Sequence, residues 1–245
     1  MLSAVLTGCA TLDNLSAERY KCALSQDGQH LTLSGPTDEK MLSCVQENTS
    51  PKLTAITVNS NGGNVETAIK AAKLLAENDL TITVKANCNS SCANYFLPIA
   101  RQIVLQKNSK ILLHGSIDEG LIAKAALEAE NGKAPEWGTA LVRTQSEFAK
   151  THRIHPGWLL YRTAEDYANR AQSQYVKGRP EVWADDGPPI KMYLVEETFF
   201  KSCLQHVIIG SFENTRAAQI YTDEAIRKSY LKQGIYPTGL MRCEE

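Results

Sequence analysis

Apolar and polar positions alternate with two periods along the first part of the chain. HLTLSG (30–35) has an apolar residue at every second position, as in a strand with one buried face. TDEKMLSCVQEN (37–48) has helical spacing, with Thr37 as the expected N-cap. LTAITVNS (53–60) is rich in β-branched residues and predicts a buried strand. VETAIKAAKLLAEN (65–78) again has the period of a helix.

The same alternation of strand and helix continues beyond residue 78. LTITVKA (80–86) predicts a strand, and CNSSCANYFLPIA (88–100) predicts a turn followed by a helix. RQIVLQ (101–106) and KILLHG (110–115) are two further strand-like runs. Because the connections are short, we expect residues 30–116 to form a layered α/β fold, with a mostly parallel sheet and flanking helices.

The second half of the chain has a less regular pattern. Residues 120–150 are expected to be helical, and residues 151–190, which contain four prolines, are expected to form loops and short helices. We interpret this region, around 120–190, as an irregular insertion. MYLVEETFFKSCLQHVII (192–209) predicts strand, helix and strand, and a terminal helix is expected over 221–234, ending at its glycine.

Composition and charge argue against a nucleic-acid-binding protein and against a membrane-spanning one. The 245 residues include 26 basic and 27 acidic side chains, for a formal net charge of −1, and the basic residues are scattered. This distribution does not favour binding to nucleic acid. No apolar run approaches the roughly 20 residues needed to span a bilayer. The hydrophobic content of 43% is typical of a globular domain, which we place at residues 21–245.

The N-terminal segment MLSAVLTGCATL carries a different signal. An apolar stretch ends in Leu-Thr-Gly-Cys9, which resembles the lipobox of bacterial lipoproteins, although a basic n-region is missing and the apolar part is short. We therefore expect a signal segment over 1–9, lipidation at Cys9 and a tether over 10–20. Ala10 stands where aspartate retains such proteins in the inner membrane, which favours an outer-membrane anchor facing the periplasm. The alternative is a buried first element with a chance cysteine.

The number of cysteines is consistent with an exported protein. Apart from Cys9 there are six cysteines, an even number that permits three disulfides in 15 connectivities. We predict a bond between Cys88 and Cys92, and the remaining pairs are guessed as Cys22 with Cys44 and Cys203 with Cys243. The alternative is a cytosolic protein with reduced, mostly buried cysteines. The C-x3-C spacing is not that of a zinc knuckle and no histidines cluster, so no metal site is predicted.

Three segments carry candidate chemistry, and each also has a purely structural interpretation. In VNSNGGNV (58–65) a strand ends at two glycines, whose N–H groups can stabilise an oxyanion or simply form a turn. Ser91 lies at the predicted start of a helix, where the helix dipole favours an alkoxide and where serine is also a common cap. His114 ends a strand, where it can act as a general base or as a half-buried hydrogen-bonded histidine.

Together these segments resemble the Clp-type serine peptidases of the crotonase-like superfamily, and their relatives in the signal peptide peptidase A and membrane-bound NfeD-like groups. The resemblance rests on ITVNSNGGNVETAIKAAKLL, CNSSCANYFLPIA, KNSKILLHG and YLVEETFFKSCLQHVII, which follow the family order and cover a little over half the chain. It implies that Ser91 is the nucleophile and His114 the general base. It also implies an oxyanion hole formed by the N–H groups of Gly63 and Cys92, with Gly62 shaping the turn.

The register of the serine and the third catalytic group are open from the sequence. Ser91 is preferred over Ser90 because it places Tyr95, Phe96 and Leu97 on the apolar helical positions of the family, whereas Ser90 would place a polar asparagine there. The acid of the triad is less evident. Asp185 and Asp186, just upstream of the closing strand, are the best candidates.

These observations predict a lipid-anchored serine peptidase of the cell envelope that requires no cofactor. Its expected partners are a peptide or protein substrate and, through the anchor, a membrane, with homo-oligomerisation left open and no nucleic acid. One alternative is a non-catalytic interaction lipoprotein with the same fold. Another is a different acyl transfer in that fold, such as thioester chemistry.

Overall fold

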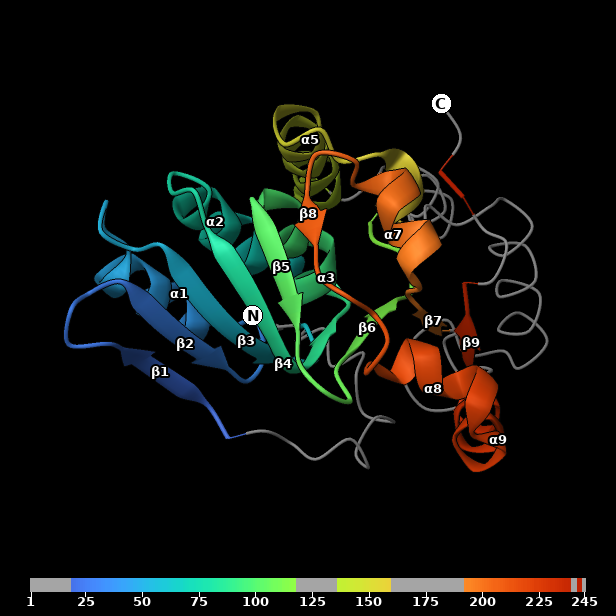
Figure 1. The fold of residues 1–245 in the computed structure, drawn as a ribbon. Helices are drawn as coiled ribbons and strands as arrows, with labels where there is room; N and C mark the ends of the chain where they lie inside the picture. Colours follow the sequence, from blue (N-terminus) through green and yellow to red (C-terminus); the bar gives the residue numbers. More distant parts are fainter. Residues whose placement is uncertain (1–18, 118–135, 160–191, 239–241, 244–245) are drawn as a thin grey trace.

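The segments predicted to alternate between strand and helix form a layered α/β structure with a mostly parallel sheet flanked by helices (Figure 1). The computed structural model describes residues 19–117, 136–159, 192–238 and 242–243. Within these ranges nine strands belong to one sheet. The predicted fold class is therefore confirmed.

The first five strands supply one side of the sheet. β1 (Lys21–Leu24) is antiparallel to β2 (His30–Ser34), and β2, β3 (Ala55–Ser60), β4 (Thr81–Asn89) and β5 (Gln102–Leu105) follow in parallel. β1 was not predicted, since KCAL is short and lacks clear alternation. The remaining four strands coincide with predicted runs to within a few residues.

The long strand β4 changes partner along its length. Its first half pairs with β5, and its last residues pair in parallel with β6 (Lys110–Leu113). β6 is in turn antiparallel to β7 (Met192–Leu194), which pairs with β9 (Ile235–Pro237), while β8 (Ile208–Ile209) pairs with β5. The carboxyl ends of β4 and β6 consequently lie side by side.

Helices α1 (Glu39–Asn48) and α2 (Val65–Leu75) pack against one face of the sheet. The N-cap of α1 is Asp38, whose side chain accepts hydrogen bonds from the second and third backbone N–H groups that follow it. The prediction of Thr37 as the cap is wrong, because its hydroxyl contacts the hydroxyl of Ser91 instead of the helix. Buried side chains from the sheet and these helices form the core: Leu31, Leu33, Met41, Leu42, Val45, Ile56, Val58, Ala68, Ile69, Ala72, Ile82 and Val84.

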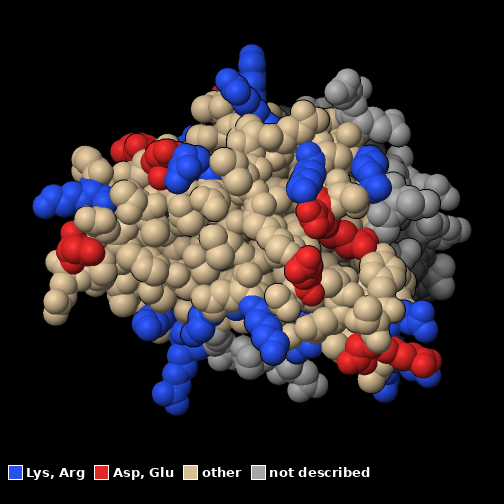
Figure 2. Space-filling view, in the orientation of Figure 1, with Lys and Arg blue, Asp and Glu red and all other residues tan. Residues whose placement is uncertain are grey.

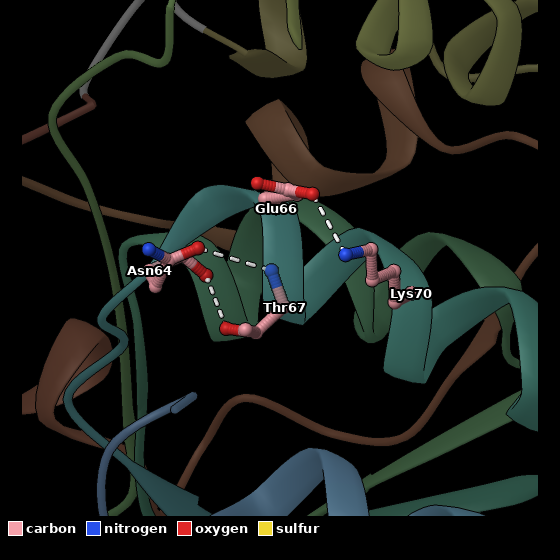
Figure 3. A network of polar contacts seen from close by, with 4 residues as sticks. All are labelled: Asn64, Glu66, Thr67 and Lys70. Carbon is pink, nitrogen blue, oxygen red and sulfur yellow. Dashed lines mark hydrogen bonds and ion pairs between the residues drawn. The ribbon is translucent and has the colours of Figure 1, made fainter. Parts of the chain in front are cut away.

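The start of α2 is fixed by a local polar network (Figure 3). Asn64 is the N-cap, and its Oδ1 accepts from the Thr67 N–H at 3.0 Å, while Thr67 Oγ1 donates to the Asn64 carbonyl at 3.2 Å. Glu66 and Lys70 form an exposed i,i+4 ion pair at 2.7 Å. Such a cap stabilises a helix by about 1 kcal/mol, and here it ends the preceding glycine turn at a defined residue.

Two short helical elements follow β4, and two others come from the predicted insertion. α3 (Ser91–Tyr95) and the 3₁₀ turn η1 (Leu97–Ile99) are almost entirely buried. α5 (Glu136–Thr151) and the 3₁₀ turn η2 (Pro156–Leu159) represent the described part of the region expected around 120–190. Trp158 in η2 donates its indole N–H to the carbonyl of Ala93 in α3 at 3.1 Å, which anchors the insertion to α3.

The C-terminal part begins with α7 (Glu197–Cys203) between β7 and β8, as predicted. The helix expected over 221–234 is confirmed as α9 (Glu224–Lys232), and it is preceded by a second helix, α8 (Arg216–Thr222), that was not predicted. Asp223 separates them because its carboxylate caps α9. Gly234, with φ of 73°, ends α9 and leads into β9, a strand that was not predicted.

The structure joins the six paired cysteines as Cys22–Cys44, Cys88–Cys92 and Cys203–Cys243, the same pairs named from the sequence. Cys9, the signal segment and most of the tether lie outside the described residues. Within the described ranges, no helix has the length and apolar character needed to cross a bilayer.

Candidate active site

A serine and a histidine meet where two neighbouring parallel strands end. Ser90 connects β4 to α3, and His114 follows β6 directly. The Ser90 Oγ and the His114 Nε2 lie 2.6 Å apart, within hydrogen-bonding distance, and both residues are partly exposed. Functional groups of α/β proteins commonly gather at this edge of a sheet, beyond the carboxyl ends of the strands.

The backbone at Ser90 is held in a conformation that serine rarely adopts. Its φ is 53° and its ψ is −126°, and the strained turn places its side chain at the sheet edge. Two hydrogen bonds to β6 maintain the turn: the Ser90 N–H donates to the Leu112 carbonyl at 2.8 Å, and the Asn89 Oδ1 accepts from the Leu112 N–H at 3.1 Å. The strand that carries His114 therefore also fixes the backbone of Ser90.

The turn is also closed covalently. Cys88, at the end of β4, is bonded to Cys92, in the first turn of α3, and both are fully buried. The disulfide brackets Ser90 and limits the separation of strand and helix.

A glycine turn approaches Ser90 from β3. Gly62 has φ of 89°, and a Cβ at this position would lie 2.6 Å from the Asn89 carbonyl oxygen and 2.7 Å from Ser90 Cβ. It would also lie 2.9 Å from the Ser91 backbone nitrogen. Glycine is required here by both conformation and space, because any side chain would displace the serine.

Ser91 does not contact His114 in this structure. It is 1% exposed, and its Oγ lies 2.7 Å from Thr37 Oγ1 and donates to the Gly63 carbonyl at 3.3 Å. The prediction that Ser91 pairs with His114 is therefore wrong by one residue. The argument for it depended on Asn94 being unsuited to a buried helical position, yet Asn94 is 1% exposed in α3.

One of the two N–H groups expected to form the oxyanion hole changes when Ser90 replaces Ser91 as the candidate nucleophile. Gly63 remains in the turn beside Ser90, and its N–H has no hydrogen-bond partner among the described residues. The second donor following the serine is the Ser91 N–H rather than that of Cys92. As the first N–H of α3 it has no partner within the helix, and its nitrogen lies next to Gly62. Both groups are suited to holding a negatively charged oxygen.

Thr37 is a site residue that the sequence did not reveal. Its N–H donates to the Gly62 carbonyl at 3.0 Å, and its carbonyl accepts from the Asn64 N–H at 3.1 Å and from Thr67 Oγ1 at 2.7 Å. With its hydroxyl on Ser91, Thr37 connects the glycine turn to the serine helix. Its position two residues after a predicted strand is the one signal that could have singled it out.

A second buried polar cluster includes residues that follow the histidine in sequence. Tyr95 of α3, Ser116 and Gln145 of α5 contact one another through side-chain oxygens at 2.5 Å, and the Gln145 Nε2 donates to the Ile117 carbonyl at 2.6 Å. The cluster fixes the backbone two and three residues after His114, and so limits the positions available to the imidazole.

Asp185 and Asp186, the candidate acids, lie outside the described residues. Across the described ranges, no three His, Cys, Asp or Glu side chains come close enough to hold a metal ion.

Comparison with known proteins yields similarity of structure only. No family model and no curated protein matches the chain. Among solved structures, the chain is similar to a ClpP1 mutant from Listeria monocytogenes, at 14% identity and a TM-score of 0.35, over 51% of this chain and 70% of the other. It is also similar to an enoyl-CoA hydratase from Shewanella pealeana, at 7% identity and a TM-score of 0.31, over 69% of this chain and 91% of the other. Similarities this distant carry no argument about activity.

Proposed function

We propose that this protein is a serine hydrolase that cleaves peptide bonds, with Ser90 as nucleophile and His114 as general base. The observation that carries the proposal is the 2.6 Å contact between the Ser90 Oγ and the His114 Nε2. A nucleophilic serine requires a neighbouring base within this distance, because its hydroxyl is a weak nucleophile on its own. The strained backbone of Ser90 supports the same chemistry, as do the adjacent N–H groups of Gly63 and Ser91, for which the described residues supply no hydrogen-bond partner.

The reaction follows from the positions of these groups. Ser90 Oγ attacks the carbonyl carbon of the scissile bond while His114 Nε2 accepts the hydroxyl proton. The N–H groups of Gly63 and Ser91 hold the oxygen of the tetrahedral intermediate. His114 then gives its proton to the departing amine, leaving an acyl group on Ser90. A water molecule, deprotonated by His114, hydrolyses this ester and regenerates the serine.

A peptide is the favoured substrate because the three site segments resemble those of Clp-type serine peptidases. The β3–glycine turn, the serine turn and the β6–histidine segment occur in the order of that family. The rival acyl-transfer chemistry, on a thioester, would use the same oxyanion donors. An acid for the triad is assigned to Asp185 or Asp186 from the resemblance alone.

We further propose that the protein is an envelope lipoprotein anchored through Cys9 to the outer membrane. Three disulfides are typical of an oxidising compartment, which supports export. When the natural gene is expressed in a bacterial host, the protein is expected to fractionate with membranes. Cys9→Ser should release the protein or block its processing. A wild-type protein that remains soluble would contradict the anchor without affecting the proposed catalysis.

The peptidase assignment is tested with a mixed peptide library. Wild type is incubated with the library, and new peptide termini are identified by mass spectrometry. Ser90→Ala should abolish their formation, whereas Ser43→Ala, on the exposed surface of α1, should leave it unchanged. An aryl thioester is tested in parallel. Hydrolysis of the thioester without peptide cleavage would replace the peptidase by thioester chemistry, and no turnover of either would favour the interaction protein.

A further inference from the structure

Among the residues that the structure describes, no helix or strand covers the outward face of the parallel strands β2 to β5. Along β2 to β5, alternate side chains enter the core against α1, α2 and α3, and the intervening ones point away from it. In Figure 1 these strands lie in front of helices α1, α2 and α3. Sheets of parallel strands almost always have both faces covered, so an open face of this kind indicates a missing partner.

The outward side chains form two rows in register across the strands, which we call the outer sheet face. Most are short or β-branched, and no Asp, Glu, Lys or Arg occurs in either row. Val104 is 39% and Ile208 58% exposed, high values for apolar side chains of a sheet. The first row contains Ala23, Thr32, Thr57, Thr83 and Val104, and the second contains His30, Ala55, Thr81, Gln102 and Ile208.

Charged side chains are confined to the margins of the outer sheet face, and the two margins differ. Figure 2 shows an uncharged expanse with only basic side chains along the lower margin, beneath β1 to β4, and acidic beside basic ones at the upper left. At the carboxyl ends of the strands the exposed residues are Lys21, Lys85 and Lys107. At the amino ends they are Asp27, Glu77 and Asp79, with Lys52 and Arg101 among them.

We propose that the outer sheet face binds the same face of a second copy of this chain. The two-fold axis lies between the two sheets and perpendicular to the strands, so β4 stacks on β4 of the partner with opposite direction. The lysine margin of each copy then lies over the acid-bearing margin of the other. In particular, Lys85 at the end of β4 faces the partner's Asp79 at its start. This inference does not depend on the chemistry proposed for Ser90.

The charge pattern is the reason for choosing a second copy. A second molecule of this chain brings both margins, and the reversed strand direction matches basic to acidic on both sides. An axis parallel to the strands would instead place lysines over lysines. The uncharged centre can be repeated across a two-fold axis without bringing like charges together. A strongly acidic or basic partner would find no counter-charge in the two central rows.

The size of the face predicts a weak dimer. Five strands about 4.8 Å apart and about five residues long give roughly 400 Å² per copy. The side chains project from the sheet and add to this area. Even so, the buried area lies at the low end of the range for specific interfaces, where transient complexes are found. Facing sheets pack about 10 Å apart with their strands inclined by about 30°, and short side chains such as threonine, valine and alanine permit this approach.

The dimer is tested by sedimentation velocity on the full chain from about 1 µM to about 200 µM. Wild type should pass reversibly from monomer to dimer over this range. Thr83→Lys places a charge in the first row and should abolish the dimer, and Val104→Lys, at a more exposed position, provides a second test if the first variant unfolds. Gln46→Lys, on the exposed side of α1, is the matched control and should dimerise like wild type. A wild type that remains monomeric throughout, or a dimer that persists in both variants, would overturn the proposal.

The orientation is tested by exchanging charges. Lys85→Asp places two carboxylates opposite each other across the interface, and Asp79→Lys places two ammonium groups there, so each variant alone should dimerise several-fold more weakly than wild type. An equimolar mixture should form a mixed dimer at lower concentration than either variant alone, with high salt reducing the difference. If the mixture shows no such recovery, the antiparallel arrangement of the two sheets is wrong.

Discussion

Ser90 Oγ lies 2.6 Å from His114 Nε2, although 24 residues separate them in sequence. The contact exists because β4 exchanges its partner β5 for β6 along its length, which brings the ends of β4 and β6 together. The Leu112 backbone then bonds to both Asn89 and Ser90. The base and the nucleophile are thus fixed by the same pair of strands.

If Ser90 and His114 act as one unit, their substitutions will not be additive. Ser90→Ala and His114→Ala should each lower kcat/KM by at least about 10³-fold, and the double variant should be little worse than either alone. Steady-state kinetics on the best peptide from the library provide the measurement. Losses that multiply in the double variant would show that the two residues act independently.

Gly62 should be intolerant of a side chain for a reason beyond backbone strain. Gly62→Ala places a Cβ 2.6 Å from the Asn89 carbonyl oxygen and 2.7 Å from Ser90 Cβ, so activity should fall at least about 100-fold. Gly28→Ala is the matched control, because Gly28 also has a positive φ, of 73°, and no atoms within 4 Å of the added Cβ. It should cost about 1 kcal/mol of stability and no activity. Equal loss of activity in both variants would contradict the account.

The Cys88–Cys92 disulfide should matter for geometry rather than for global stability. Its cysteines are 4 residues apart, against 40 for Cys203–Cys243, so it constrains the unfolded chain far less. Replacing both Cys88 and Cys92 by alanine should reduce activity more, and the free energy of unfolding less, than replacing Cys203 and Cys243. Denaturant unfolding and kinetics on the two double variants measure this. Free thiols at Cys88 and Cys92 in non-reduced peptide maps would remove the premise.

Lys110 should make stability depend on pH. Burial, reinforced by the nearby Arg216, lowers its pKa from the ordinary value of 10.5 to about 8. Between these pH values the unfolded chain binds more protons than the folded one, so the free energy of unfolding should rise with pH over this range. Lys110→Met should flatten that rise and stabilise the protein at pH 7 by about 2 kcal/mol. Urea unfolding from pH 7 to pH 10 compares the two proteins, and parallel pH profiles would contradict the effect.

The sequence predicts the central elements well because their patterns are long and agree with one another. The β-branched run at 53–60, the helical period at 65–78 and the apolar runs on either side of the serines each have one consistent interpretation. β1 and β9 were not predicted, because they are short and their pairing depends on distant segments that local pattern does not contain. The division between α8 and α9 depends on Asp223, a cap that a continuous helical pattern conceals.

The candidate site was predicted in its segments but not in its register. Periodicity cannot separate Ser90 from Ser91, since α3 is buried on every side and accepts Asn94 as readily as Tyr95. The deciding features are the positive φ of Ser90 and the hydrogen bond between Ser91 and Thr37. Both arise from tertiary packing of β2, β3 and β6 around the turn, which local sequence does not encode.

The central claim is that Ser90, and not Ser91, is the activated nucleophile. The most direct measurement is labelling with a fluorophosphonate probe, in which the serine oxygen displaces fluoride from phosphorus and the base takes the proton, followed by mass-spectrometric location of the adduct. The account predicts an adduct on Ser90, lost in Ser90→Ala and greatly slowed in His114→Ala. Ser91→Ala should still be labelled on Ser90, at a reduced rate because the Ser91 hydroxyl supports the glycine turn. An adduct on Ser91, or no labelling of the folded wild type, would contradict the account.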